Sequence, residues 1–339
     1  MAKRLIAVIL LVVVFHVSAV AQETDTLDLN AAFQDIRHEL DALPAPQEFD
    51  LSGYSLITED ISDLLSAYPS VTLRFNVTMY GHTFSSNAAL IDFGKTIITD
   101  ITELKAGLAV LPMLEQVNMY ESVLSREQMA ELAEAFPDLR FGWTIKLGSY
   151  MVRTDITAFS SLHTPQAKRF SSSYYSVLRY CWQLQALDLG HNGIIDLNFM
   201  ETMTDLRVLI LADNRIKDIS PLARLTKLEY VELFLNRIKD ISPLANMENL
   251  LDLNISFNVI SNFSPMLSCP RLERLWIHRN NLNKEHRMEL EEKLPNVDIC
   301  YSASHGTGGG WRKHERYYVI KDIFDHWAYQ PFSGGDTQQ

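Results

Sequence analysis

The side chains best suited to bind a ligand recur at intervals of 22 residues between positions 186 and 279. Aromatic, charged and amide residues alternate at these positions, and Tyr, Trp and Arg dominate the energetics of protein interfaces. The candidate binding residues are Ile210, Tyr230, Glu232, Phe234, Leu235, Asp252, Asn254, Phe257, Arg274, Trp276 and His278. We expect them to form one ligand-binding surface, if the elements that carry them place their side chains on a common exposed face.

The same positions offer little for catalysis or metal binding. His191 and His278 lie about four repeats apart, and other residue types interrupt the carboxylates Asp188, Glu232 and Asp252. The sequence contains no Gly-x-Ser-x-Gly, phosphate-loop or His-Glu-x-x-His motif. We therefore expect no catalytic residue, no metal and no cofactor. An enzyme with an unrecognised site in the N-terminal half is a less favoured alternative.

A 22-residue repeat must position the candidate residues. Leucines recur at this spacing and each begins an alternating apolar stretch, which predicts a short strand with every second side chain buried. An asparagine follows each strand, and its amide can satisfy backbone groups where the chain turns. The leucines are Leu184, Leu206, Leu228, Leu250 and Leu272, and the asparagines are Asn192, Asn214, Asn236, Asn258 and Asn280. Stacked repeats of this kind predict a parallel sheet with short helical turns, beginning near Pro221, Pro243 and Pro265, on its far side.

The repeat L-x-x-L/V-x-L/I-x-x-N-x-I/L resembles that of bacterial leucine-rich repeat proteins with 22-residue units, the internalin-like class. The resemblance implies an α/β solenoid whose parallel sheet lines a concave face, and a non-catalytic module that recognises a protein ligand on that face. A surface glycan is the alternative ligand, for which Tyr230, Asp252, Asn254 and Trp276 would supply stacking and hydrogen bonds. Intramolecular cover by the N-terminal block or by residues 311–329 is a second interpretation of the aromatic residues.

Less regular segments flank these repeats. Residues 51–84 align with 119–152 at a shift of 68, and a shorter copy covers 282–301; they predict helices beginning near Thr58, Ser125 and Asn283. Hairpins are expected at 71–85 and 139–153. We expect an N-terminal helix or cap at 22–48, an irregular leucine-rich-like region at 49–160 and a connecting segment at 161–183. Regular repeats should occupy 184–301, and a C-terminal cap helix with a tail 302–339; a ligand-docking helix is the alternative.

The start of the chain predicts export. Lys3 and Arg4 precede an apolar stretch at 5–20, and Ala19-Val20-Ala21 fits a signal-peptidase site, so we expect residues 1–21 to be a cleaved signal peptide. A retained anchor is the alternative. The product should be secreted or held at the cell surface, without insertion in the membrane. With a net charge of -12, nucleic acid is not an expected partner.

Overall fold

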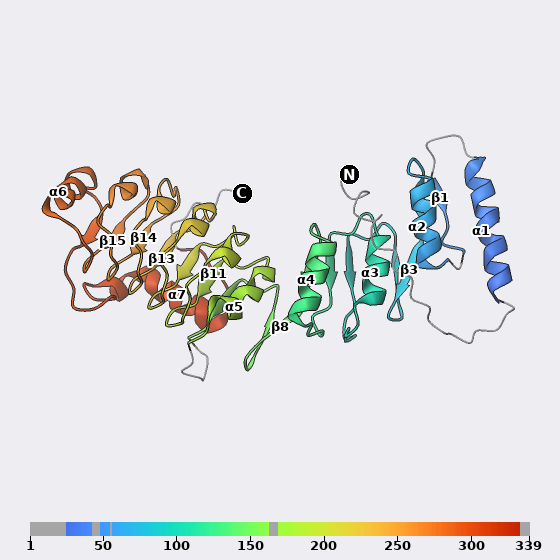
Figure 1. Cartoon of the computed structure of the whole chain (residues 1–339), viewed down its shortest axis with the longest axis horizontal. Coiled ribbons are helices and arrows are strands. Elements are labelled where there is room, and N and C mark those ends of the chain that lie inside the picture. The colour runs from blue at the N-terminus through green and yellow to red at the C-terminus, as the bar shows by residue number, and fades with distance from the viewer. Residues whose placement is uncertain (1–24, 43–47, 55, 163–168, 333–339) are drawn as a thin grey trace. The chain divides into compact units, whose positions relative to one another are not determined.

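The computed structural model describes residues 25–42, 48–54, 56–162 and 169–332. The chain divides into two compact units, Met1–Thr144 and Ile145–Gln339 (Figure 1). The expected signal peptide lies outside the described residues. Among those described, no helix combines the length and apolar character needed to cross a bilayer.

A seven-stranded parallel sheet is the centre of the second unit. Its strands follow one another in chain order: β10 (Ala158–Ser160), β11 (Ala186–Asp188), β12 (Val208–Ile210), β13 (Tyr230–Glu232), β14 (Asp252–Asn254), β15 (Arg274–Trp276) and β16 (Asp298–Cys300). From β11 to β15 each step in the register is 22 positions, as in the pairs Val208–Tyr230 and Tyr230–Asp252. The first step, Ala158 to Ala186, is 28 positions and the last, Arg274 to Asp298, is 24. The repeat in the sequence is therefore the strand register of an α/β solenoid, as predicted.

Short helical turns close each coil on the side away from the sheet. These are η2 (Ser176–Tyr180), η3 (Asn198–Met200), η4 (Ser220–Arg224), η5 (Ser242–Leu244) and η6 (Ser264–Ser268), and α6 (Lys284–Lys293) follows β15. A proline follows the first serine of η4, η5 and η6. Its fixed φ suits the start of a helical turn, and the N–H that it lacks would have no partner within the turn. A coil of 22 residues leaves room for only one such turn.

The asparagine column links neighbouring coils. The Asn214 amide donates to the carbonyls of Leu189, at 2.9 Å, and Leu211, at 3.1 Å, while its oxygen accepts from the Ile194 N–H at 2.9 Å. Asn236 and Asn258 repeat the pattern one and two coils later. These buried amides satisfy backbone groups that have no sheet partner, which explains why one residue type recurs at this position.

The first unit has longer helices and smaller sheets. It contains α1 (Asp25–Asp41), β1 (Glu48–Asp50), α2 (Thr58–Ala67), β2 (Thr72–Arg74), β3 (Asn76–Met79), β4 (His82–Ser85), β5 (Leu90–Asp92), α3 (Thr102–Ala109), β6 (Gln116–Asn118), α4 (Arg126–Ala135) and β7 (Arg140–Gly142). Strands β1 and β2 form one parallel pair. Strands β5, β6 and β7 form a second parallel sheet, in that order, and β3 and β4 form an antiparallel hairpin. Helix α4 begins at a capping box between Ser125 and Gln128.

Several local predictions are confirmed. Helices α2, α4 and α6 begin at or next to the three expected residues. The two expected hairpins are β3–β4 and β8–β9, where β8 spans Thr144–Leu147 and β9 spans Tyr150–Arg153.

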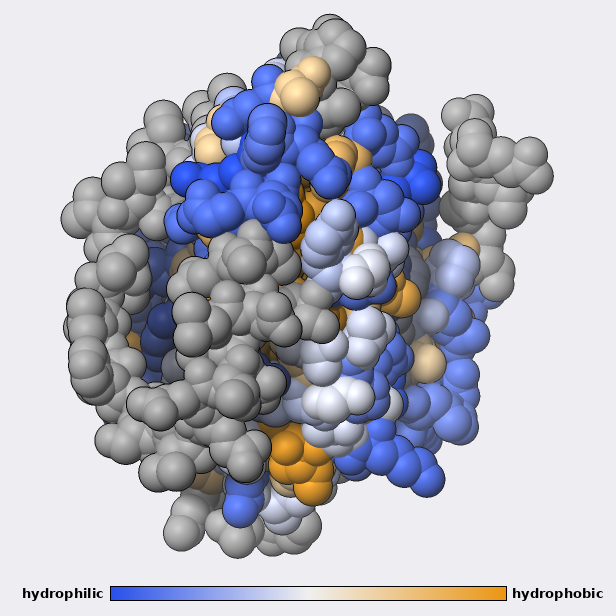
Figure 2. All heavy atoms as spheres, turned by 90° about the vertical axis from the view of Figure 1, so that its right-hand side faces the viewer, coloured by the Kyte–Doolittle hydropathy of each residue, from blue (hydrophilic) through white to orange (hydrophobic). Residues whose placement is uncertain are grey.

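On the face that Figure 2 turns to the viewer, hydrophilic side chains predominate and hydrophobic ones form small separate patches.

The C-terminal segment, residues 302–332, contains η7 (Trp311–Lys313) and α7 (Glu315–His326). Helix α7 contacts β10 and β11, at the start of the sheet, and Trp311 packs on β13 and β15. The segment therefore runs back across the sheet. The expectation that this helix covers the open end of the solenoid is wrong in its location, because the apolar surface that it buries is the sheet face.

Candidate functional site

The concave face of the second unit holds the residues that the sequence singled out. Nine of the eleven are at most 5% exposed: Ile210, Tyr230, Glu232, Phe234, Asp252, Asn254, Arg274, Trp276 and His278. Leu235, at 41%, is exposed and Phe257 is partly buried. The expectation that all of them face solvent therefore does not hold, because the C-terminal segment covers the face. This arrangement corresponds to the intramolecular cover considered above.

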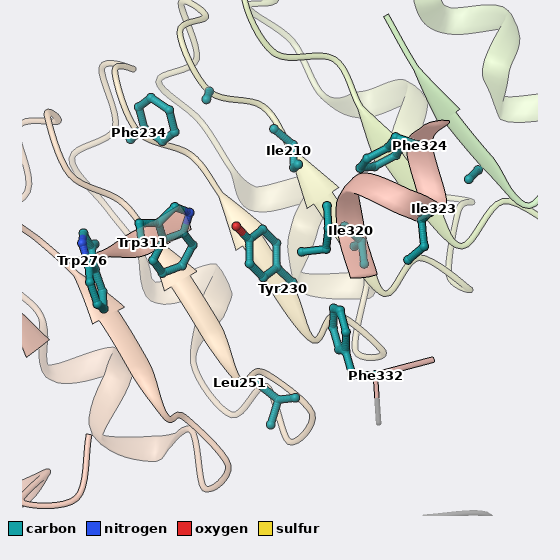
Figure 3. Close-up of a cluster of buried hydrophobic side chains, with 14 residues drawn as sticks. Ile210, Tyr230, Phe234, Leu251, Trp276, Trp311, Ile320, Ile323, Phe324 and Phe332 are labelled. Atoms are coloured by element: carbon teal, nitrogen blue, oxygen red, sulfur yellow. The ribbon is translucent and has the colours of Figure 1, made fainter. Parts of the chain in front are cut away.

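An aromatic contact anchors the segment (Figure 3). The Trp311 ring lies between Tyr230, with ring centroids 5.3 Å apart, and Trp276, at 5.1 Å. Apolar side chains of α7 and the residues after it extend the same buried cluster toward β11 and β12; they are Ile320, Ile323, Phe324 and Phe332. All of these side chains are at most 6% exposed. The face and the segment thus share one hydrophobic core.

Glu232 is a fully buried carboxylate on β13. It accepts hydrogen bonds from Trp311 Nε1 at 2.8 Å, from Arg312 Nη2 at 3.0 Å and from the Tyr230 hydroxyl. Burial raises the pKa of Tyr230 well above its usual value, and the Glu232 charge acts in the same direction, so the phenol stays a hydrogen-bond donor. Two of the three donors to Glu232 come from the C-terminal segment.

Asp252, on β14, is the second fully buried carboxylate. Arg316 forms a bidentate pair with it: Nε donates to Oδ2 at 2.7 Å and Nη2 donates to Oδ1 at 2.9 Å. Arg274 Nη1 lies 3.7 Å from the same carboxylate, and its guanidinium carbon lies over the rings of Trp276, at 4.8 Å, and Trp311, at 4.6 Å. Planar bidentate pairs of this kind fix orientation as well as charge, so Arg316 sets the position of α7 on the sheet.

Backbone carbonyls of the segment complete the contact. Asn254 Nδ2 donates to Gly306 O and Trp276 Nε1 donates to Gly308 O, each at 2.8 Å. A Cβ at Gly306 would lie 2.3 Å from a Phe234 ring carbon. The glycine-rich stretch at 306–310 therefore lets the backbone approach the sheet closely.

Asp188 differs from the other two acidic residues on this face because no cationic side chain of the described residues forms a salt bridge with it. It accepts hydrogen bonds from the Gly190 N–H at 2.9 Å and from Ser160 Oγ at 3.1 Å. Burial raises its pKa to about 6, with a smaller contribution from the Glu232 charge. Asn254 takes the equivalent position on β14 and accepts from the Ser256 N–H at 3.2 Å in the same way.

No group of three or more His, Cys, Asp or Glu side chains that could hold a metal ion occurs among the described residues. His191 pairs with Asp213, Nδ1 to Oδ2 at 3.0 Å, and His278 faces the carbonyl of His305 at 3.1 Å. The two histidines thus have separate protein partners.

Sequence reasoning missed the partners of the buried carboxylates. Arg312 and Arg316 are four residues apart beyond the glycine-rich stretch, and both reach acidic side chains on the sheet. A signal was present in the sequence: two carboxylates at sheet positions, Glu232 and Asp252, needed cations, and the C-terminal segment carries an aromatic residue followed by arginines.

Comparisons with known proteins agree with this geometry. Residues 204–246 match the family model for leucine-rich repeats in two copies. A search of curated proteins found no match.

Similar solved structures include internalin C2 of Listeria monocytogenes, with 21% identity over 71% of this chain and 92% of that one, at a TM-score of 0.36. Internalin F of the same species has 19% identity over 80% and 75%, at 0.39, and the Leptospira interrogans leucine-rich repeat protein LIC12759 has 16% over 73% and 63%, at 0.35. With the matched repeats within its seven-stranded parallel sheet, the second unit has the α/β fold of a leucine-rich repeat solenoid.

Proposed function

We propose that this chain is an exported bacterial module that binds protein and has no catalytic activity, and that its concave face is the surface that recognises a protein segment. Leucine-rich repeats commonly serve as protein-binding scaffolds. In the structure the face already holds a series of turns and a helix of the chain itself, through a buried aromatic anchor, desolvated charge pairs and side-chain bonds to carbonyls. These are the contacts that dominate protein interfaces.

One observation carries the proposal. The two fully buried carboxylates of the sheet, Glu232 and Asp252, receive most of their hydrogen bonds from Trp311, Arg312 and Arg316 of the C-terminal segment. A sheet that served only as a core would gain nothing from such residues, because buried charges are costly unless they are paired. The face therefore suits a protein segment in which a large aromatic residue is followed by arginines.

An external partner must replace the chain's own segment. Five of its large apolar side chains are buried on the face: Trp311, Ile320, Ile323, Phe324 and Phe332. At about 1.5–3 kcal/mol each, they contribute roughly 7–15 kcal/mol before the entropy of ordering the segment is subtracted. Tethering further gives the segment a local concentration on the order of millimolar. A partner would therefore have to reproduce most of these contacts.

The two alternatives receive less support. A glycan would need Tyr230, Asp252, Asn254 and Trp276, and all four are buried beneath the segment. An enzymatic site in the N-terminal half has no catalytic family match in its support, since the matched repeats, residues 204–246, lie in the second unit.

Cutting the chain once after folding tests the proposal. Residues 302–305, the first four of the segment, connect its remainder to β16. Ser302, Ser304 and His305 are exposed, so a protease site placed there should be accessible. We expect the cut segment to stay bound through gel filtration at micromolar concentration. A labelled peptide of residues 306–332 should exchange into its place, and Arg316→Ala in the segment should speed its dissociation at least tenfold.

Tyr318→Ala is the matched control, because Tyr318 lies on the same helix and is 62% exposed. It should leave the dissociation rate unchanged. Immediate loss of the cut segment at micromolar concentration would contradict the proposal. So would a segment that never exchanges with the peptide, since the face would then be a permanent core. Mass spectrometry of the protein recovered outside the producing cells tests export, with cleavage after Ala21 expected.

A further inference from the structure

A second surface lies at the edge of the solenoid, where each coil turns away from its strand. Two rows of residues flank the buried asparagine column there, one residue before and one after each asparagine. Six exposed or half-exposed members of these rows, all apolar or basic, form what we call the rim: Arg215, Leu235, Arg237, Phe257, Val259 and Arg279. The other exposed or half-exposed members are His191, Gly193, Asp213 and Asn281. Within its described part, residues 302–332, the C-terminal segment makes no hydrogen bond to any of them, and it covers the adjacent concave face instead.

The backbone of the first row has an unusual conformation. His191, Asp213, Leu235, Phe257 and Arg279 all have φ between 51° and 59°, in the left-handed region. This conformation favours Gly, Asn and Asp and is unfavourable for bulky side chains. Leu235 nonetheless occupies it while 41% exposed, so its apolar side chain gains little burial in return. Because the conformation recurs in five successive coils, the turn of the repeat imposes it, and neither backbone geometry nor packing explains why an exposed apolar side chain occupies this position.

Regular stacking brings the apolar rim residues together. The Leu235 N–H donates to Ser256 O at 3.1 Å and the Phe257 N–H to His278 O at 2.9 Å. In the second row, the Arg237 N–H donates to Ile216 O and the Val259 N–H to Ile238 O. These bonds hold adjacent coils at the usual strand spacing of about 4.8 Å. Leu235 and Phe257 are therefore neighbours in the first row, and Val259 lies in the second row on the same coil as Phe257; we call these three residues the apolar strip. The Phe257 ring also packs edge-on against His278, with ring centroids 5.3 Å apart.

The rim also carries unbalanced positive charge. Arg215, Arg237 and Arg279 are exposed, and none of the three forms a salt bridge with any residue that the structure describes. Asp213 is the acidic residue of the first row, and it is already paired with Arg169 at 2.8 Å and with His191 at 3.0 Å. The chain as a whole has 42 acidic and 30 basic residues, so three unpaired arginines beside an apolar strip contrast with the overall charge.

We propose that the rim docks a segment of a partner protein in which acidic residues flank a large apolar side chain. The apolar side chain would cover the strip formed by Leu235, Phe257 and Val259, and the carboxylates would pair with the surrounding arginines. A polyanion such as DNA suits this surface less well, because an apolar strip offers it nothing and a net charge of -12 repels it. The rim does not depend on the concave face, so the two proposals can fail separately.

Selection of random 16-residue peptides displayed on phage, against the immobilised full chain, tests the rim. We expect the selected peptides to be enriched in Asp and Glu around a Phe, Leu, Trp or Ile. Arg237→Glu should weaken binding of a selected peptide at least tenfold. Lys239→Glu makes an equal charge change at an exposed residue two positions away and should have little effect.

Leu235→Asn separates binding from structure. Asparagine tolerates the left-handed conformation, so this variant should melt at the same temperature as wild type or higher, yet lose at least tenfold in peptide affinity. A clearly lower melting temperature would show that Leu235 is a structural residue. Selected peptides without acidic enrichment, or binding insensitive to Arg237→Glu, would overturn the proposal. A 20-base-pair DNA or anionic vesicles that bind as tightly as the peptides would overturn it too, in favour of a general polyanion surface.

Discussion

Removing the Arg316 guanidinium should destabilise the second unit more than removing any exposed charged side chain of the same helix. In Arg316→Ala the buried Asp252 carboxylate loses both of its short hydrogen bonds, at 2.7 and 2.9 Å, and keeps only Arg274, whose Nη1 is 3.7 Å away. The Arg316 and Asp252 side chains are 11% and 0% exposed, so water cannot replace the lost donors. The variant therefore leaves a buried charge that is almost uncompensated.

The expected magnitude follows from this burial. Breaking a buried ion pair by removing one partner costs about 3–5 kcal/mol, and the remaining Arg274 contact places the expected loss near the lower end of that range. Asp252→Asn in the same chain should restore part of the lost stability, because the stranded charge is then gone. Lys321→Ala is the matched control, since Lys321 pairs with Asp325 on the same helix but is 62% exposed.

Urea unfolding followed by tryptophan fluorescence measures the effect. Four of the five tryptophans, Trp182, Trp276, Trp311 and Trp327, belong to Ile145–Gln339, so the signal reports mainly on the second unit. If Arg316→Ala lowers the free energy of unfolding no more than Lys321→Ala does, the charge pair does not hold the segment on the sheet. An additive double variant with Asp252→Asn would lead to the same conclusion.

Three other predictions concern the same unit. Ending the chain after Tyr301 should lower stability by several kcal/mol and cause aggregation, because the aromatic sheet face is uncovered; a monomer with an unaltered melting temperature would contradict this. A thiol reagent should modify the partly exposed Cys300 first and spare Cys181 and Cys269, whose burial raises the pKa of each thiol; equal labelling of all three would show that the coil register is wrong. Burial raises the pKa of Asp188 above its unfolded value, so its contribution to stability is present below about pH 4 and is lost as pH rises to about 6. Asp188→Asn should therefore be more stable than wild type at pH 7 and should remove this dependence, as melting curves between pH 4 and 7.5 would show.

The regular half of the fold could be predicted because its physical signal is local and repeated. Leu206 and Asn214 recur 22 positions later as Leu228 and Asn236, and the strands that contain them pair at that offset. The helix at Ser125 and the prolines of η4 to η6 were likewise visible as capping and breaking signals. Each of these features depends on residues close in sequence or related by the repeat.

The state of the concave face could not be predicted in the same way. Alternation along β13 shows that Tyr230 points away from the inside of the coil, but not whether another part of the chain covers it. The cover comes from Trp311 and Arg316, which are 81 and 64 residues beyond the residues that they contact, Tyr230 and Asp252. No repeat relates these positions, so only the complementary charges and aromatic residues could have suggested the contact.

The position of the C-terminal segment has a consequence for how the protein is made. Synthesis proceeds from the N-terminus, so the coils can stack before their cover exists. Until residues 302–332 are complete, Tyr230 and Trp276 face solvent beside two carboxylates that lack their partners Trp311, Arg312 and Arg316, and the nascent sheet is open to chaperones and to other nascent chains. An error that ends translation between residues 302 and 311 would thus release all seven strands of the sheet with the aromatic face uncovered.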